Sequence, residues 1–305
     1  MFSHTTTFSE AVSRLRKGDV NLDTQILAVE HLNKCFGKAE ILHDVDFSVS
    51  RGDVYGLVGQ NGAGKTTLLR LIAGLMKPTK GNILCYMEKD YIGYLPQSCR
   101  FDDGQTVTST ISFFSTLRKV DKDEGILLCK KLGLDMNKKV KHLSPGQQKK
   151  LQMVIAMIGD PDFYILDEPT AGLDPSATFE MSKLIRELHE KGKSILLSSH
   201  ILQDMDAICT NVAIMESGSL IYDRELESSY IVSTSPLPEE VMVALEGRYS
   251  LGINADHTTL HVKTDKKGVA RLVKILVLQS VDIYEVTRSS VKNVVQEQLH
   301  MVGEV

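Results

Sequence analysis

A glycine-rich stretch, GLVGQNGAGKTT at residues 56–67, lies between a short apolar run and a helical pattern. Within it, Gly59 to Thr66 matches the spacing G-x-x-x-x-G-K-[ST] without a gap. Glycines let the main chain wrap closely around phosphate oxygens, and the start of the following helix points N–H groups at the anion. We therefore predict a phosphate-binding loop rather than a simple glycine-rich turn.

The side chains of this loop have distinct expected tasks. Lys65 should reach the β- and γ-phosphates of a nucleotide, and Thr66 should offer its hydroxyl to Mg²⁺. The expected ligands are therefore ATP and Mg²⁺. The predicted nucleotide contacts in the loop are Gly59, Asn61, Gly62, Ala63, Gly64, Lys65, Thr66 and Thr67.

Two adjacent carboxylates follow another apolar run, in FYILDEPT at residues 163–170. Open parallel sheets bind ligands at the carboxyl ends of their strands, where Asp167 and Glu168 would emerge. We predict that Asp167 holds Mg²⁺, through water, and that Glu168 polarises the attacking water as general base. Alone, such a pair could be a solvated turn; an intact phosphate loop in the same chain favours the catalytic interpretation.

His200 ends a third apolar run, SILLSSH at residues 194–200, at the same kind of strand end as Asp167. It could donate a hydrogen bond to a γ-phosphate or orient the attacking water. The alternative is a structural histidine, which is the commoner role for a lone histidine.

Residues 142–150, HLSPGQQKK, open a helix in a way that capping explains only in part. Ser144 is a natural N-cap, and Gln147 three residues later completes a capping box. Lys149 and Lys150, however, lie near the positive end of the helix dipole, which is locally unfavourable. Because helix N-termini bind phosphate readily, we interpret this helix start as the site of an arriving anion.

The elements that must position these side chains form an α/β pattern over residues 27–222. Continuous apolar strands alternate with amphipathic helices, as in a largely parallel sheet covered on both faces. Between about 98 and 158, consecutive helical stretches replace this alternation and predict a helical insertion. Residues 1–26 are polar, and we expect an N-terminal extension.

Residues 223–305 show a different pattern. PLPEE marks a break, and the order of elements is about βαββαβα, with a final helix from about Ser289. This order predicts a small C-terminal α+β domain of the ferredoxin-like kind. Because it holds none of the nucleotide motifs, we expect an accessory or regulatory domain.

Composition narrows the classes of partner. The 305 residues carry a formal net charge of −4 without a strongly basic block, so we expect no nucleic acid as partner. No apolar run approaches the roughly 18 residues needed to span a bilayer, so we expect a chain that is soluble by itself. The five cysteines form no CxxC and are expected to be reduced thiols of a cytoplasmic protein.

The stretch LSPGQ resembles the L-S-G-G-Q signature of ATP-binding-cassette (ABC) ATPases. Other motifs of that family occur in the family's order: Phe36 in KCFGK, the phosphate loop, Gln97 in YLPQ, LSPGQ at 143–147, ILDEP, AGLDP at 171–175, and SSH at 198–200. The resemblance covers roughly residues 27–222. It implies a P-loop NTPase fold: a RecA-like core with an antiparallel β edge and the helical insertion.

The resemblance also implies a head-to-tail dimer. Each ATP would lie between the phosphate loop of one subunit and the signature of the other, where Ser144, Gly146 and Gln147 would contact it. Pro145 replaces the family's usual glycine and removes one N–H. Because Ser144 and Gly146 are kept, we take the signature as competent.

Three further roles come from the resemblance alone. Phe36 would stack on adenine, Gln97 would bind Mg²⁺ or sense water and link the core to the helical insertion, and Asp174 would meet the partner subunit. The alternatives are a core residue for Phe36, a surface-turn residue for Gln97, and a cap of the helix from Pro175 for Asp174.

By this resemblance the chain is identified as an Mg-dependent ATP hydrolase, with Lys65, Gln97, Glu168 and His200 as catalytic residues. It would power substrate movement through separate transmembrane permease subunits at the cytoplasmic face of the membrane. The C-terminal part resembles the small domain of bacterial export-type ATPase subunits. The second cassette of the dimer would be another copy or a related chain.

Two other functions remain open to the sequence. A soluble, non-transport ABC ATPase acting on nucleic acid or the ribosome is disfavoured by the single cassette and the negative net charge. A regulatory subunit that hydrolyses little is disfavoured by the intact Glu168 and His200. The transported substrate is chosen mostly by the membrane subunits, so the sequence leaves it open.

Overall fold

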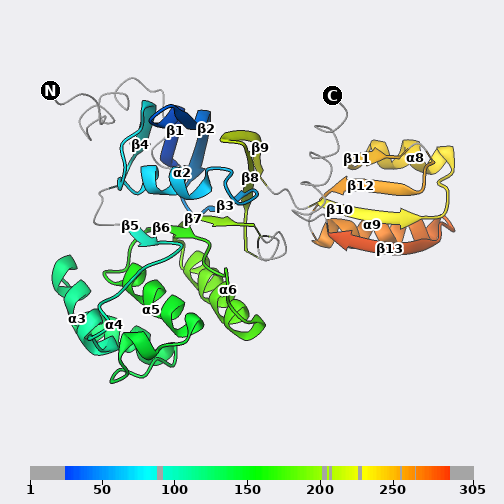
Figure 1. Cartoon of the computed structure of the whole chain (residues 1–305). Coiled ribbons are helices and arrows are strands. Elements are labelled where there is room, and N and C mark those ends of the chain that lie inside the picture. Colours follow the sequence, from blue (N-terminus) through cyan, green and yellow to red (C-terminus); the bar gives the residue numbers. More distant parts are fainter. Residues whose placement is uncertain are drawn as a thin grey trace. The chain divides into compact units, whose positions relative to one another are not determined.

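The computed structural model describes residues 25–87, 92–200, 205, 208–225, 229–254, 256–264 and 266–288. The chain divides into two compact units, Met1–Arg224 and Glu225–Val305 (Figure 1). The predicted N-terminal extension, except its last two residues, and the predicted helix from Ser289 lie outside the described residues.

The first unit contains a three-stranded antiparallel sheet. Its strands are β1 (Gln25–Phe36), β2 (Ala39–Ser50) and β4 (Lys80–Cys85), in the order β2-β1-β4. β1 and β2 form a hairpin in which Phe36 pairs with Ala39, leaving a two-residue turn. This sheet is the predicted antiparallel β edge.

A six-stranded sheet carries the residues predicted to do chemistry. Its strands are β3 (Val54–Val58), β5 (Ile92–Leu95), β6 (Phe163–Asp167), β7 (Ser194–Ser199), β8 (Asn211–Glu216) and β9 (Ser219–Glu225). Their order is β5-β6-β7-β3-β8-β9, and the first five run parallel. Every residue of β3, β6 and β7 is buried, as expected for apolar strands covered on both faces.

Helices cover both faces of this sheet. α2 (Lys65–Ile72) lies between the two sheets, where Leu68 and Leu69 join a core shared with both (Figure 1). α6 (Pro175–Glu190) covers the opposite face. The carboxyl ends of β3, β6 and β7 therefore meet at one edge of the sheet, beside the start of α2.

The predicted helical insertion is present. It contains α3 (Val107–Arg118), α4 (Lys122–Lys131), a 3₁₀ turn at Val140–His142, and α5 (Pro145–Met157). These elements share a separate apolar core that includes Ile111, Leu151 and Val154. Arg118 ties the insertion to the sheet, because its guanidinium donates to the carbonyls of Ile158 and Ile92 at 3.0 and 2.9 Å.

The second unit has the predicted ferredoxin-like arrangement. Its elements are β10 (Ser229–Thr234), α8 (Glu239–Glu246), β11 (Ser250–Ile253), β12 (Thr259–Lys263), α9 (Lys266–Leu278) and β13 (Ile283–Arg288). The antiparallel sheet has the order β11-β12-β10-β13, so the first and last strands of the unit are neighbours. One apolar core, with Val232, Leu260 and Leu272, joins this sheet to the two helices.

The close approach of α5 to β5 depends on Gly93. A Cβ added there would lie 2.4 Å from the carbonyl oxygen of Ala156, which belongs to the main chain and cannot rotate away. We expect Gly93→Ala to lower the free energy of unfolding of the first unit by about 1–3 kcal/mol, as overpacking typically does. Thermal and denaturant unfolding would measure the change.

Gly104→Ala, in the same unit, is the control for this substitution, because its Cβ would meet only the end of the exposed Asp102 side chain, at 3.3 Å. Equal stability of the Gly93→Ala variant and the unchanged protein would contradict the packing argument.

Candidate functional site

The loop between β3 and α2 forms one wall of a cavity of about 220 Å³. The cavity is lined by Ile41, Asn61, Gly62, Gly64, Lys65, Thr66, Thr67, Gln97 and Glu168. Eight of these nine residues are ones that the sequence predicted for the site. Ile41, on β2, was not predicted, because its place depends on how the antiparallel sheet folds over the loop.

Packing requires glycine at two positions of the loop. Gly64 has φ 103°, and a Cβ there would lie 2.8 Å from Leu42. A Cβ at Gly59 would lie 2.3 Å from the carbonyl oxygen of Met215 on β8. The loop is therefore pressed against β2 and β8 on one side, while its other side faces the cavity.

Lys65 is 5% exposed and lies on the cavity wall. Its Nζ donates to the carbonyls of Gly59 and Gln60 at 2.7 and 2.9 Å, and lies 4.0 Å from Oε1 of Glu168. Burial lowers the pKa of Lys65, and the charges of Glu168 and Asp167 oppose this shift. The two carboxylates thus help to keep the buried ammonium charged.

Asp167 ends β6 and is fully buried. Its Oδ1 accepts hydrogen bonds from Oγ1 of Thr66 at 3.1 Å and Oγ of Ser198 at 2.8 Å. Its Oδ2 has no hydrogen-bond partner among the described residues. A buried carboxylate oxygen without a partner, beside a threonine hydroxyl, suits a hard cation such as Mg²⁺.

Glu168 has φ 48°, a strained conformation for a residue other than glycine. This backbone aims the carboxylate at the residues predicted to act with it. Nε2 of Gln97 donates to Oε2 at 3.3 Å, and Nδ1 of His200 lies 3.3 Å from Oε1. Such strain persists where surrounding contacts fix it, which is typical of functional sites.

Ser198 joins the two predicted carboxylates, and the sequence analysis did not single it out. It accepts a hydrogen bond from the main-chain N–H of Glu168 at 3.0 Å and donates to Asp167, so it fixes the two carboxylates relative to each other. The sequence marks it only as one of three serines in the run SILLSS, and the structure shows that it is fully buried.

The predicted capping box at the start of α5 is confirmed. The N–H of Gln147 donates to Oγ of Ser144, and Oε1 of Gln147 accepts from the N–H of Ser144, both at 3.2 Å. Gly146 packs beside Ala177, just after the helix cap at Asp174, which accepts from the N–H of Ala177 at 2.9 Å.

The residues assigned to adenine and to the partner subunit lie outside the cavity wall. Ser144, Gly146, Gln147 and Asp174 are all exposed or half-exposed at the starts of α5 and α6. Phe36, at the end of β1, is 50% exposed, with Nζ of Lys34 over its ring at 4.9 Å. Phe36 is therefore not a core residue.

The two lysines of α5 have partners within the chain, contrary to the interpretation that an anion accounts for them. Nζ of Lys149 donates to the carbonyl of Gln97 at 3.0 Å, and Nζ of Lys150 to that of Leu132 at 3.3 Å. Lys150 also forms an ion pair with Glu180. These contacts offset the unfavourable position of the cations on the helix dipole.

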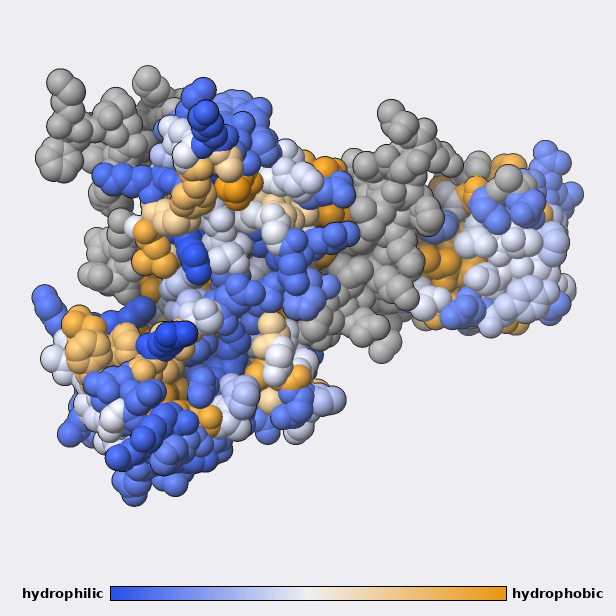
Figure 2. Space-filling view, in the orientation of Figure 1, coloured by the Kyte–Doolittle hydropathy of each residue, from blue (hydrophilic) through white to orange (hydrophobic). Residues whose placement is uncertain are grey.

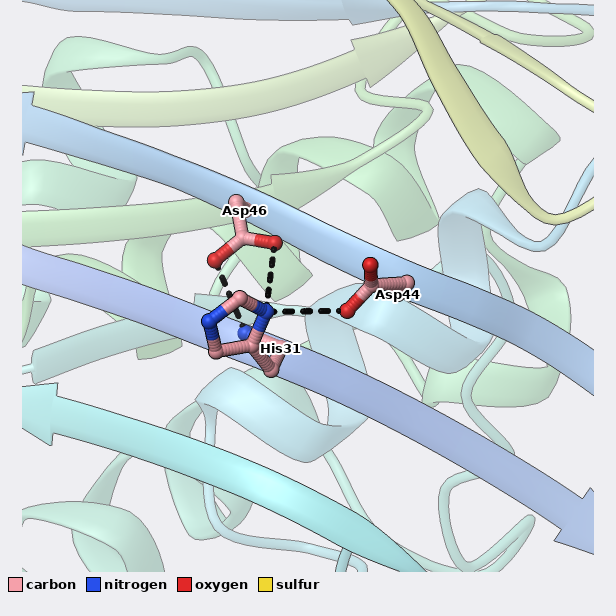
Figure 3. Close-up of side chains that lie close together, drawn as sticks. All are labelled: His31, Asp44 and Asp46. Carbon is pink, nitrogen blue, oxygen red and sulfur yellow. Dashed lines mark hydrogen bonds and ion pairs between the residues drawn. The ribbon is translucent and has the colours of Figure 1, made fainter.

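A cluster of three exposed side chains lies away from the cavity wall, where β1 and β2 are irregularly paired (Figure 3). Nδ1 of His31 is 3.0 Å from Asp44 and 3.4 Å from Asp46. The hydrogen bond to Asp44, and then the charges of both aspartates, raise the pKa of His31. The protonated form is favoured, so the cluster stabilises the hairpin at low pH and loses this effect as pH rises through the raised pKa.

The sequence has relatives in several organisms. A family model described as "ABC transporter" matches residues 42–171. The uncharacterized ABC transporter ATP-binding protein YhcH of Bacillus subtilis is 30% identical over 92% of this chain and 96% of its own length. An uncharacterized ABC transporter ATP-binding protein of Methanocaldococcus jannaschii is 36% identical over 66% of this chain and 78% of its own. Nod factor export ATP-binding protein I of Ralstonia nicotianae is 34% identical over 65% of this chain and 66% of its own length.

Solved structures resemble the first unit. An ATP-binding subunit of an ABC transporter superposes with a TM-score of 0.61 and 29% identity, covering 66% of this chain and 90% of that one. A nucleotide-free ATP-binding cassette from an ABC transporter superposes with a TM-score of 0.60 and 22% identity. The match covers 73% of this chain and 95% of that one, which shows a shared fold. The predicted P-loop NTPase fold is confirmed.

Lys65 supplies a direct test of the cavity. We expect Lys65→Ala to weaken ATP binding about tenfold to hundredfold, since hydrogen bonds to charged groups are worth roughly 1.5–3 kcal/mol. Calorimetric titration with ATP and Mg²⁺ would measure it. Lys141→Ala, which changes an exposed lysine outside the cavity wall, is the control. Unchanged affinity in the folded Lys65→Ala variant would exclude the phosphate-loop assignment.

Proposed function

The chain belongs to the family of ABC transporter ATP-binding proteins, and on this premise we propose how its residues divide the work of ATP hydrolysis. The protein is the ATP-binding and ATP-hydrolysing subunit of an ABC transporter. The observation that carries the division of roles is that Lys65 and Glu168 are buried on the wall of one cavity, while the buried Asp167 accepts a hydrogen bond from Thr66 of the same wall.

In the proposed mechanism, the loop around Lys65 binds the phosphates of ATP and orients the γ-phosphate toward Glu168. Thr66, Asp167 and Gln97 would hold Mg²⁺, which supplies charge neutralisation on the phosphates. Glu168 takes a proton from the attacking water. His200 and Gln97 contact the two oxygens of Glu168, so they can fix the direction in which it accepts that proton.

We propose further that two cassettes act together. Ser144, Gly146 and Gln147 form a capped helix start that stays exposed and does not line the chain's own cavity. A neighbour's γ-phosphate would accept hydrogen bonds there, as helix N-termini allow. Asp174, beside it, would meet the same neighbour, and Phe36 would stack on adenine in its own chain's site.

Membrane subunits are the proposed partners of the helical insertion. Phe113 and Leu117 on α3 are 53% and 61% exposed, and Leu127 on α4 is 69% exposed. Figure 2 shows hydrophobic residues gathered over α3. Among the described residues, no helix has the length and apolar character to cross a bilayer. Docking of this surface on transmembrane permease subunits would therefore keep the ATPase peripheral, at the cytoplasmic face of the membrane.

The functional division that we propose is an extension at 1–26, the cassette at 27–222 and an accessory domain at 223–305. The relative named for Nod factor export supports an export role. A role on nucleic acid or the ribosome is disfavoured by the net charge of −4.

Glu168 provides the test of the catalytic assignment. We expect Glu168→Gln to retain ATP affinity while turnover falls about 10²-fold or more, because the general base is lost and the shape is kept. Phosphate release and ATP titration would measure the two quantities. Glu180→Gln, on α6 outside the cavity, is the control. Normal turnover in Glu168→Gln would exclude it as the base.

Mixing two inactive variants tests the composite site. Ser144→Arg should block the helix start, and Lys65→Ala should disable the phosphate loop. In a mixed dimer, the loop of the first chain and the signature of the second form one intact site. We expect activity to reappear at about a quarter of the wild-type rate, because half of the randomly formed dimers are mixed and each has one working site.

The control for this experiment mixes Lys65→Ala with Glu168→Gln. Both changes disable the same side of the site, so no intact site forms and no activity should return. Coupling that demands two working sites would also suppress activity, and a crosslink separates the cases. In the proposed dimer, residue 144 of one chain crosslinks to the phosphate loop of the other. A crosslink between residue 144 and the phosphate loop of the same chain would exclude the proposed dimer.

A further inference from the structure

Lys149 lies on α5 and is only 6% exposed. Its ammonium group donates a hydrogen bond to the carbonyl of Gln97 at 3.0 Å, across 52 residues of sequence. A buried ammonium is costly unless hydrogen bonds and opposite charges compensate it. A lysine retained at such a place therefore needs a reason beyond filling the core.

Charges supply the second part of its environment. Burial lowers the pKa of Lys149, and the charges of Asp167 and then Glu168 oppose the shift. Both carboxylates are themselves buried, at 0% and 5% exposure. Lys149 is therefore a second buried lysine, besides Lys65, whose charged form the two carboxylates favour, and it comes from the helical insertion rather than from the phosphate loop.

Gln97 connects this lysine to the reacting region. It lies two residues after the end of β5, and its Nε2 donates to Oε2 of Glu168 at 3.3 Å. The side chain can keep that contact only if the main chain at Gln97 is held in place. The hydrogen bond from Lys149 holds the carbonyl of the same residue.

Lys150, the next residue, shows that this placement is specific to one lysine. Its side chain is 21% exposed and contacts the carbonyl of Leu132 and the carboxylate of Glu180. Leu132 lies at the end of α4 and Glu180 on α6, and neither residue takes part in the hydrogen bond between Gln97 and Glu168. The two lysines have the same chemistry and adjacent positions, and only Lys149 reaches the site.

We infer that Lys149 is a positioning residue for hydrolysis, which holds the main chain at Gln97 so that the Gln97 side chain stays on Glu168. The inference rests on the proposed roles of Gln97 and Glu168. Helix α5 then has two contacts. Its cap, Ser144, is the residue proposed to meet the neighbour's ATP, and Lys149, five residues later, holds Gln97 of the helix's own chain. Displacement of α5 by the neighbour's nucleotide would thus be transmitted to Glu168.

The test is a cycle of three variants: Lys149→Met, Gln97→Ala and the double variant. Lys149→Met keeps an unbranched side chain, one heavy atom shorter, but removes the charge and the donors. We expect it to lower kcat about tenfold or more, as misplacement of a catalytic group does, while KM for ATP changes by less than about twofold. In the double variant kcat should equal that of Gln97→Ala, because without the glutamine side chain there is nothing left for Lys149 to position.

Lys150→Met is the matched control and should leave kcat within about twofold of the wild type, since small effects are usual away from a site. If Lys149→Met does not fold, Lys149→Leu, a smaller side chain without charge or donors, enters the same cycle. A wild-type kcat in the folded variant, or losses that multiply in the double variant, would overturn the inference. If Gln97→Ala and Glu168→Gln both hydrolyse ATP normally, the proposed roles fail instead.

Discussion

The burial of four charged side chains in one small region is the constraint on which the rest of the site depends. Lys65, Lys149, Asp167 and Glu168 are each at most 6% exposed. Buried charges must be paired and hydrogen-bonded, or their desolvation would destabilise the fold. Each of these groups has such partners, and Oδ2 of Asp167, without one among the described residues, is the atom that would accept a cation in the proposed mechanism.

These charges come from elements that are far apart in the sequence, so the architecture must deliver them to one place. Parallel strands bring the ends of β3, β6 and β7 to the same edge, and the glycine loop turns the chain into α2 there. Ser198, on the strand beside β6, then ties Asp167 to the main chain of Glu168. The helical insertion contributes Lys149, whose ammonium group donates to the main-chain carbonyl of Gln97.

The predictions that succeeded rest on short-range patterns or on alternating elements. The phosphate loop and the capping box at Ser144 each span fewer than ten residues, and the strand–helix alternation fixes the α/β and ferredoxin-like folds. Contacts between distant segments could not be read from the sequence. Ser198 and Asp167 are separated by 31 residues, and Lys149 and Gln97 by 52. Their meeting depends on the register of the strands and on how the insertion packs.

The start of α5 shows how such a distant contact changes an argument made from local sequence. Two cations near a positive helix end indicate a missing anion as long as only the helix is considered. The carbonyls of Gln97 and Leu132 and the carboxylate of Glu180 supply that negative charge from within the chain. The lysines therefore do not argue for a phosphate. What favours an external phosphate is the helix start itself, which is capped by Ser144 and Gln147, carries Gly146, and remains exposed. The lysines act farther along, where Lys149 fastens the helix to Gln97 and Lys150 fastens it to α6.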